Sequence, residues 1–197
     1  MYSKTHTRAI VLGHYDVGEA SRTYRLFTRE LGVVLARCQS SRSLGSRQRY
    51  GLQTFSVCDV SLVRARGGWR LTNVTPLASL YAAHREDSRV RALISRVFSL
   101  IKRFVVGEEE GSELFDLVWN GLSFLEKQTI SPENIKWFEA LFVLRILNVL
   151  GYVQDDSHYA PHLTSSSEFS IELIESFAPV HRTAISEINR AIESSHL

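Results

Sequence analysis

The sequence predicts an α+β protein in two parts: a β-rich domain over residues 1–78 and an α-helical domain over residues 79–197. The first observation is the spacing of apolar residues, which alternate at first and later recur every three or four positions. The second is charge: residues 1–75 carry 12 Lys and Arg against 4 Asp and Glu, whereas residues 104–197 carry 5 against 15. A basic first half favours contact with nucleic acid or a membrane surface.

Five stretches of the first part have the alternation and β-branched content of strands: residues 5–15, 21–28, 33–36, 52–67 and 69–75. Gly67 and Gly68 predict a hairpin turn between the last two. Five short strands with one long connection, rich in serine and arginine, fit a small barrel such as the five-stranded oligonucleotide-binding (OB) fold. A β-sandwich or an SH3-like barrel fits the same pattern, so both stay open at this point.

The spacing typical of helices begins after Thr75 and Pro76, where we expect Thr75 to cap a helix and Pro76 to occupy its first turn. Further helices are predicted over residues 89–104, 112–127, 131–150 and 178–193. The helix that ends at Leu150 is apolar nearly all round, which is typical of a central, buried helix. Residues 153–170 are polar and are predicted to form a loop.

The residues predict no enzyme and no cofactor. The acidic residues of the basic half lie in different predicted elements, without the spacing of a two-metal site: Asp16, Glu19, Glu30 and Asp59. The phosphate-loop motif GxxxxGK[ST] and the nucleophile motif GxSxG do not occur in the sequence. Cys38 and Cys58 lie in strand-like stretches, where small core residues are the more frequent role.

A metal site and a membrane location are not expected either. His158 and His162 have an H-x3-H spacing without a second ligand pair, which favours loop histidines over a zinc site. No apolar run approaches the length that crosses a bilayer, and the N-terminus lacks the features of a secretory signal. Two cysteines in that context predict reduced thiols in a cytoplasmic protein.

Nucleic-acid binding is the better supported function. Eleven of the 12 basic residues in residues 1–75 are arginine, whose planar fork suits phosphate oxygens. The predicted contacts are Arg22, Arg37, Arg42, Arg47, Arg49, Arg64 and Arg66. The aromatic residues considered for base stacking are Tyr15, Tyr24, Tyr50 and Trp69. Core filling is the more frequent role for each, and Tyr50, beside Arg49 in a polar stretch, is kept as a predicted contact.

Two motifs resemble the RecO family of bacterial recombination mediators. GHYDVGEASRTYRLFTRELGVV over residues 13–34 is similar to the start of that family, with matches at Tyr15, Glu19, Arg22, Leu26, Phe27, Thr28, Arg29, Glu30 and Gly32. SRSLGSRQRYGLQTF over residues 41–55 is similar to the basic loop and Leu-Gln-x-Phe segment that follow in the family. FEALFVLRILNVLGY over residues 138–152 resembles a helix end of the family, with matches at Arg145, Leu150, Gly151 and Tyr152.

This resemblance implies an N-terminal OB-fold barrel and a helical C-terminal domain. It implies a DNA repair and recombination mediator that binds single- and double-stranded DNA, promotes strand annealing and works with RecR to load RecA on SSB-coated strands. Such a protein would be cytoplasmic and associated with the nucleoid. Two other hypotheses remain open: an RNA-binding OB-fold factor, and a non-catalytic adaptor whose basic face meets an acidic protein.

The chain departs from the family pattern at three points. Cys38 and Gln39 stand where the family often has a lysine-glycine pair, which affects the expected loop geometry. Residues 155–169 contain no cysteine, whereas many members have a four-cysteine zinc site there, so no metal is expected. The chain is also shorter than most members, so we expect the final helices to be trimmed.

Arg145 is the lone charge in an apolar helix and has two interpretations. An unpaired buried charge is costly, so the first is an ion pair with a nearby carboxylate. The second is a site for the acidic, carboxylate-ended tail of SSB, because a free carboxylate suits an arginine fork.

The serine- and arginine-rich stretch generates the first testable prediction. Replacing Arg42, Arg47 and Arg49 by alanine is expected to weaken oligonucleotide binding in steps, because each removed guanidinium leaves a phosphate without a partner. Fluorescence anisotropy with single-stranded DNA at two salt concentrations measures the loss. Unchanged binding by the triple variant at moderate salt would show that this stretch is not part of the site.

Overall fold

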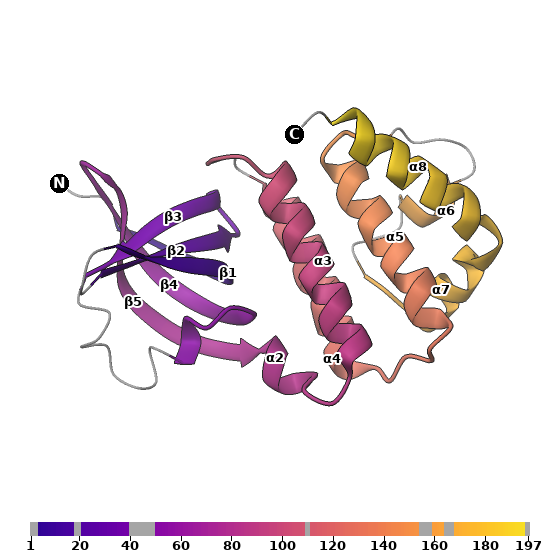
Figure 1. The fold of residues 1–197 in the computed structure, drawn as a ribbon, viewed down its shortest axis with the longest axis horizontal. Coiled ribbons are helices and arrows are strands. Elements are labelled where there is room, and N and C mark those ends of the chain that lie inside the picture. Colours follow the sequence, from indigo (N-terminus) through magenta and orange to yellow (C-terminus); the bar gives the residue numbers. More distant parts are fainter. Residues whose placement is uncertain are drawn as a thin grey trace. The chain divides into compact units, whose positions relative to one another are not determined.

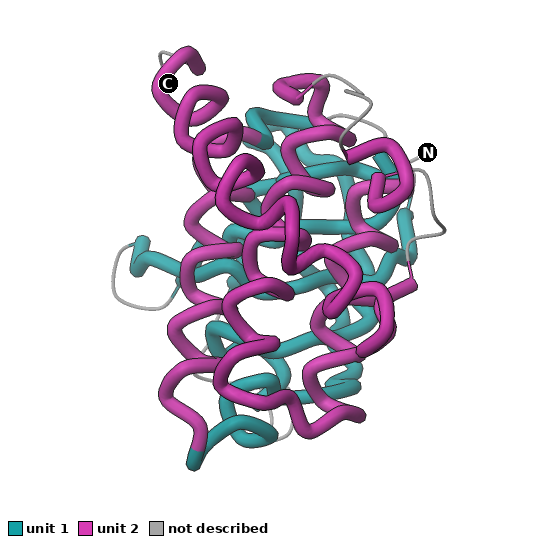
Figure 2. Tube along the Cα trace, turned by 90° about the vertical axis from the view of Figure 1, so that its right-hand side faces the viewer, with its two compact units in different colours: residues 1–86, 105–112 teal, residues 87–104, 113–197 magenta. Residues whose placement is uncertain are grey.

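The chain folds into two compact units in a computed structural model that describes residues 4–17, 21–39, 50–108, 111–153, 159–163 and 168–195. The first unit consists of residues 1–86 together with residues 105–112, and the second of residues 87–104 with residues 113–197. Figures 1 and 2 show this division. Residues 105–112 thus return to the first unit, a detail that the spacing of apolar residues does not indicate.

The first unit is a closed barrel of five strands. The strands are β1 (Lys4–Val17), β2 (Ser21–Thr28), β3 (Gly32–Cys38), β4 (Ser56–Ala65) and β5 (Gly68–Ser79). They follow the order β1-β2-β3-β5-β4, and β4 pairs with β1 to complete the ring. All pairs are antiparallel except β3 and β5, which run parallel. The predicted five-stranded OB fold is confirmed.

Closure depends on the length of β1. Its first half pairs with β4 and its second half with β2, so one strand serves two neighbours. The register shifts between Val11 and Gly13, and Gly13 has a φ of 154°, a conformation that favours glycine. The alternate side chains of the strands fill the interior: Ala9, Val11, Tyr24, Leu26, Val34, Ala36, Cys38, Cys58, Val60, Leu62, Trp69, Leu71 and Val74. The remaining positions face outward, and those among them that are exposed are available for a ligand.

The prediction that a helix begins at Thr75 and Pro76 is wrong. Strand β5 continues to Ser79, whose hydroxyl accepts a hydrogen bond from the Ala82 amide and caps the short helix α2 (Leu80–Ala83). Pro76 pairs with Cys58 next to a register shift, a place where a strand tolerates proline. The strand predicted from residue 52 also begins later, at residue 56, after Phe55 with a φ of 71°.

The second unit is entirely helical where it is described. Its helices are α3 (Ser88–Phe104), α4 (Ser112–Lys127), α5 (Asn134–Val149), α6 (Ala160–Leu163), α7 (Ile171–Phe177), a 3₁₀ turn (Ala178–Val180) and α8 (His181–Ser194). Helix α5 packs against α3, α6, α7 and α8 and buries most of its length, so the predicted central helix is confirmed. Helix α6 falls within residues 153–170, which were predicted as loop throughout. None of the described helices is long and apolar enough to cross a membrane.

The close approach of α4 and α5 generates the second prediction. A Cβ atom added at Gly121 would lie 2.5 Å from the ring of Phe142, so Gly121→Ala overpacks this contact. We expect a loss of about 1–3 kcal/mol in the free energy of unfolding, reduced by the roughly 1 kcal/mol that alanine contributes over glycine within a helix. Urea unfolding followed by circular dichroism measures it. Gly67→Ala is the control, because a Cβ atom there meets nothing within 4 Å, and equal midpoints for both variants would contradict the packing argument.

Candidate nucleic-acid interface

A row of outward-facing residues crosses four strands of the barrel, and only Thr23 among them is buried, at 8% exposure. Tyr15 on β1 pairs with Thr23 on β2, Thr23 pairs with Arg37 on β3, and Arg37 pairs with Arg70 on β5. Paired positions of neighbouring strands project from the same side of a sheet. Tyr15 is 51% exposed, and Arg37 and Arg70 are also exposed, so this row lies on the outside of the barrel.

A second pair lies beside this row, two residues along β2 and β3. Arg25 pairs with Leu35, and both side chains are exposed, Leu35 by 44%. Residues two apart on a strand share a face, so these side chains extend the row. We call the whole set the arginine face: Tyr15, Thr23, Arg25, Leu35, Arg37 and Arg70.

The guanidinium groups of the arginine face have no carboxylate partner in the part of the chain that the structure describes. Within the described residues, Arg25, Arg37 and Arg70 form no ion pair and no side-chain hydrogen bond. Arg37 and Arg70 stand directly opposite each other on neighbouring strands, where like charges repel. An anion bound between them would remove that repulsion. The arrangement therefore suits a polyanion with evenly spaced charges.

Two predicted contacts are already engaged by acidic residues of the chain itself. Arg22 Nε lies 2.6 Å from a carboxylate oxygen of Asp16, its neighbour across β1 and β2. Arg64 donates to both carboxylate oxygens of Glu108, at 2.6 Å to Oε1, and its guanidinium lies 5.0 Å from the centre of the Trp69 ring. Both pairs are exposed, so a phosphate group can compete with the carboxylates.

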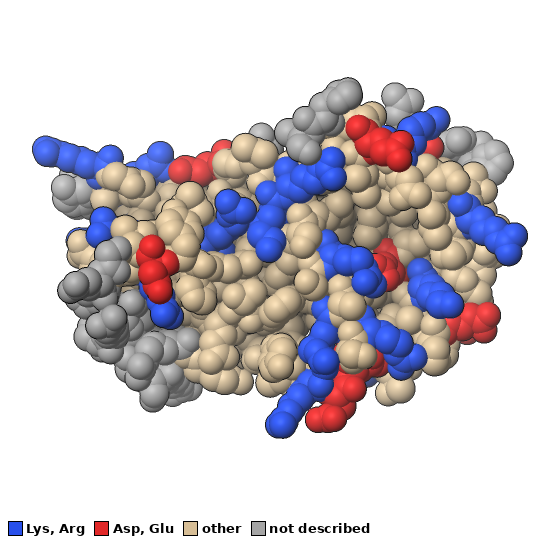
Figure 3. Space-filling view, in the orientation of Figure 1, with Lys and Arg blue, Asp and Glu red and all other residues tan. Residues whose placement is uncertain are grey.

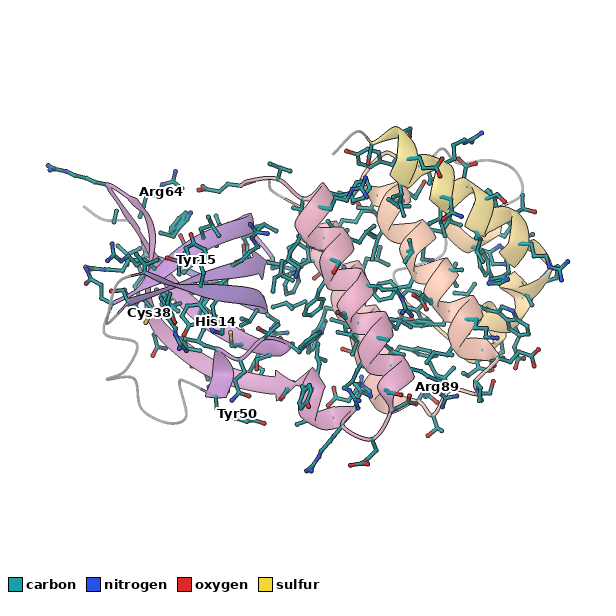
Figure 4. All side chains as sticks on the ribbon, in the orientation of Figure 1. His14, Tyr15, Cys38, Tyr50, Arg64 and Arg89 are labelled. Carbon is teal, nitrogen blue, oxygen red and sulfur yellow. The ribbon has the colours of Figure 1, made fainter. Side chains whose placement is uncertain are left out.

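The other predicted contacts are spread over the barrel unit. Arg66 is exposed in the turn between β4 and β5, and Tyr50 is 47% exposed. Figure 4 shows Tyr50 and Arg64 on opposite margins of this unit. Arg42, Arg47 and Arg49 lie outside the described residues. On the face drawn in Figure 3, basic side chains lie at separate points over the barrel with acidic ones between them.

Arg25 and Arg70 are not among the contacts predicted from the sequence. The alternation in β2 was a usable signal for Arg25, because it places this residue on the same face as Thr23. No local signal identifies Arg70, since its place beside Arg37 results from the parallel pairing of β3 and β5. Of the aromatic residues considered for stacking, Tyr24 and Trp69 belong to the barrel core.

Arg145 lies inside the helical unit, where it is only 3% exposed. Its Nε donates to the carbonyl of His162 over 2.7 Å, its Nη1 donates to the carbonyl of Glu168 over 3.0 Å, and the guanidinium lies 4.8 Å from the centre of the Phe169 ring. Burial lowers the pKa of Arg145 to about 10. Arg145 thus connects α5 to the segments around α6 and before α7, and a peptide carboxylate would reach it only if these segments moved. Its contact with an SSB tail stays a prediction.

The described residues offer little for metal or thiol chemistry. No group of three or more His, Cys, Asp or Glu side chains in the described ranges is placed to hold a metal ion. The ring of His162 lies 3.2 Å from the Ser176 hydroxyl, and His158 is outside the described residues. Cys38 and Cys58 are buried, and burial raises the pKa of both thiols, that of Cys58 to about 12, so neither is an activated nucleophile.

A closed five-stranded barrel with an outward arginine face, followed by a helical unit, defines an OB-fold protein with a separate helical domain. Residues 1–80 match the family model described as "Recombination protein O N terminal". The resemblance of this chain to the RecO family is therefore confirmed for the barrel.

Curated relatives extend this similarity beyond the barrel. The chain is 30% identical over 148 residues to the DNA repair protein RecO of Geobacter metallireducens, which covers 75% of this chain and 59% of that protein. It is 28% identical over 149 residues to RecO of Thermodesulfovibrio yellowstonii, with 76% and 58% covered. It is 32% identical over 132 residues to RecO of Myxococcus xanthus, with 66% and 54% covered. The matched region spans between half and three fifths of the length of these relatives.

The contact between Glu108 and Trp69 generates the third prediction. Arg64 and then Trp69, whose Nε1 donates to Glu108 over 2.9 Å, hold the pKa of this carboxyl below its ordinary value of 4.5. A lowered pKa means that the stabilising contribution is complete above the unfolded pKa and is lost as the pH falls through the folded pKa.

We expect the indole N–H resonance of Trp69 to shift with pH, with a midpoint below 4.5, in two-dimensional NMR spectra. Glu108→Gln is the control and should abolish this titration while leaving the other tryptophan resonances in place. A midpoint at or above 4.5 would contradict the pairing.

Proposed function

We propose that this chain binds DNA through the arginine face of its barrel and takes part in DNA repair and recombination. The observation that carries the proposal is the placement of Arg25, Arg37 and Arg70 on adjoining strands of one outer face, where no acidic residue of the described ranges pairs with them. The similar proteins from other organisms are named DNA repair protein RecO, which agrees with this ligand.

The mechanism is non-covalent. Each guanidinium that neutralises a phosphate releases condensed counterions, so affinity falls as salt rises and does not depend on base sequence. Exposed Tyr15 offers a ring on which a base can stack beside the arginines. Stacking on an aromatic residue contributes roughly 1–3 kcal/mol per base. The arginine face therefore combines cations that bind the phosphate backbone of DNA with one aromatic ring, Tyr15, that can stack on a base.

The finer role proposed for the chain is that of a recombination mediator. It binds single- and double-stranded DNA, promotes annealing by lowering the repulsion between strands, and acts with RecR to load RecA on SSB-coated DNA. The family resemblance supports these steps and these partners. A DNA-bound protein of this kind would associate with the nucleoid. It would use no catalytic residue and no cofactor, since neutralising phosphates makes and breaks no covalent bond.

Several predicted contacts extend this proposal. Arg66 and Tyr50 are exposed and supplement the arginine face as contacts for a longer oligonucleotide. Arg22 and Arg64 would contribute by exchanging Asp16 and Glu108 for phosphate. The segment with Arg42, Arg47 and Arg49 adds further positive charge to the same domain.

The test of the arginine face is the fourth prediction. Replacing Arg25, Arg37 and Arg70 by alanine is expected to reduce the slope of log K against log salt concentration by about 2 on single-stranded DNA, since each phosphate contact contributes roughly 0.7. Fluorescence anisotropy across a salt series measures the slope. The matched control replaces Lys4, Lys127 and Arg182, exposed cations outside this face, so that the net charge changes equally.

An unchanged slope in the triple variant, or an equal reduction in the control, would overturn the proposed site. Competition between RNA and DNA oligonucleotides separates the RNA-binding alternative, because preferential displacement by RNA would assign the same face to RNA. Absence of binding to either polymer would favour the adaptor hypothesis.

A further inference from the structure

Helix α3 is the basic exception in an otherwise acidic helical unit. It contains five basic residues and no acidic one, whereas residues 113–197 carry 5 Lys and Arg against 12 Asp and Glu. On the face shown in Figure 3, blue side chains gather over the region that α3 occupies in Figure 1. We call this set the α3 basic face: Arg89, Arg91, Arg96, Lys102 and Arg103.

The basic residues of α3 are ordered by the helical repeat. Arg89, Arg96 and Arg103 are seven residues apart, which places them along one edge of the exposed side, with about 10.5 Å between successive positions. Lys102 and Arg91 lie along the other edge. The space between the edges holds small, mostly hydroxyl-bearing residues: Ser88, Ala92, Ser95 and Ser99. The opposite side of the helix carries its buried apolar residues.

The ion pairs of Arg89 and Arg96 leave the charge of both arginines accessible to a ligand. Arg89 lies 3.4 Å from Asp87, and Arg96 Nη2 lies 2.7 Å from a carboxylate oxygen of Glu139. Both arginines are more than half exposed, and exposed ion pairs contribute little to stability, so phosphate oxygens can take the place of the carboxylates.

In the last turn of α3, Arg103 is engaged in a contact with α8, whereas Lys102 is exposed. Arg103 Nη2 donates to the carbonyl of Ile192 at the end of α8, over 3.0 Å. Lys102 is exposed and has no ion pair within the described residues. A test therefore replaces Lys102 and leaves Arg103 in place.

We propose that the α3 basic face is a second site for a nucleic-acid strand, bound through its phosphates, so that one chain holds two strands at once. Two edges of cations with serine hydroxyls between them match a phosphodiester backbone, whose oxygens accept from both groups. The α3 basic face has no aromatic side chain on which a base could stack, so we expect binding there to be independent of base sequence. The inference rests on the proposed function for the identity of the polymer, but it depends on residues of α3 alone.

Two strands on one chain have a direct consequence for annealing. Complementary strands held by separate sites of the same molecule meet at a high effective concentration, without a second protein molecule. Neutralisation of phosphates at both sites also lowers the repulsion between the strands. The helical unit then contributes to pairing as well as to contacts with other proteins.

The test is the fifth prediction and counts strands per chain. The full chain is titrated at low salt with a short fluorescent oligothymidine, and sedimentation velocity gives the number of oligonucleotides bound to each molecule. The variant Arg89→Gln with Lys102→Gln is expected to bind one strand instead of two. The matched control, Lys127→Gln with Arg182→Gln, removes equal charge elsewhere in the helical unit and is expected to bind two.

Equal stoichiometry for the two variants would overturn the inference. Unchanged strand binding by the α3 variant, together with lost binding to polyglutamate, would also overturn it and assign the face to an acidic protein. The barrel variant of Arg25, Arg37 and Arg70 keeps the two proposals distinguishable. If that variant binds DNA normally while the α3 variant loses a strand, the arginine face fails and the α3 site stands.

Discussion

The parallel pairing of β3 with β5 is the constraint on which the first unit depends. Without it the sheet would remain open, and the side chains of the barrel core would face solvent. The same pairing places Arg37 directly beside Arg70, although 33 residues separate them in the sequence. Closure of the barrel therefore also brings together two arginines that have no ion pair within the described residues.

The basic residues of the chain fall into distinct classes once their neighbours are known. Arg22 and Arg64 have carboxylate partners within the first unit, so part of their charge is already neutralised. Arg25, Arg37 and Arg70 have no such partner among the described residues, so they gain more from an external anion than Arg22 and Arg64 do. This distinction explains why a count of arginines predicts the kind of ligand but does not identify the contacts.

The buried Arg145 of the second unit contacts backbone carbonyls and an aromatic ring. Arg145 donates to backbone carbonyls and lies over an aromatic ring, so its charge is balanced by dipoles and by the ring face. The carbonyl acceptors come from segments on both sides of residues 164–167, which links α5 to the chain that leads into α7. An interior charge of this kind organises the helical unit, whereas the charges of α3 lie on its exposed side.

Local sequence patterns are sufficient to predict the strand and helix types, the central position of α5 and the basic character of the first unit. These properties depend on periodicity and composition, which are local. The end of β5 was misjudged because a proline next to a register shift has the same local appearance as a proline in a first helical turn. Which arginines share a face and which have acidic partners depends on the three-dimensional fold. Strand pairing brings together residues that are distant along the chain, and no local pattern records which strand will lie beside which.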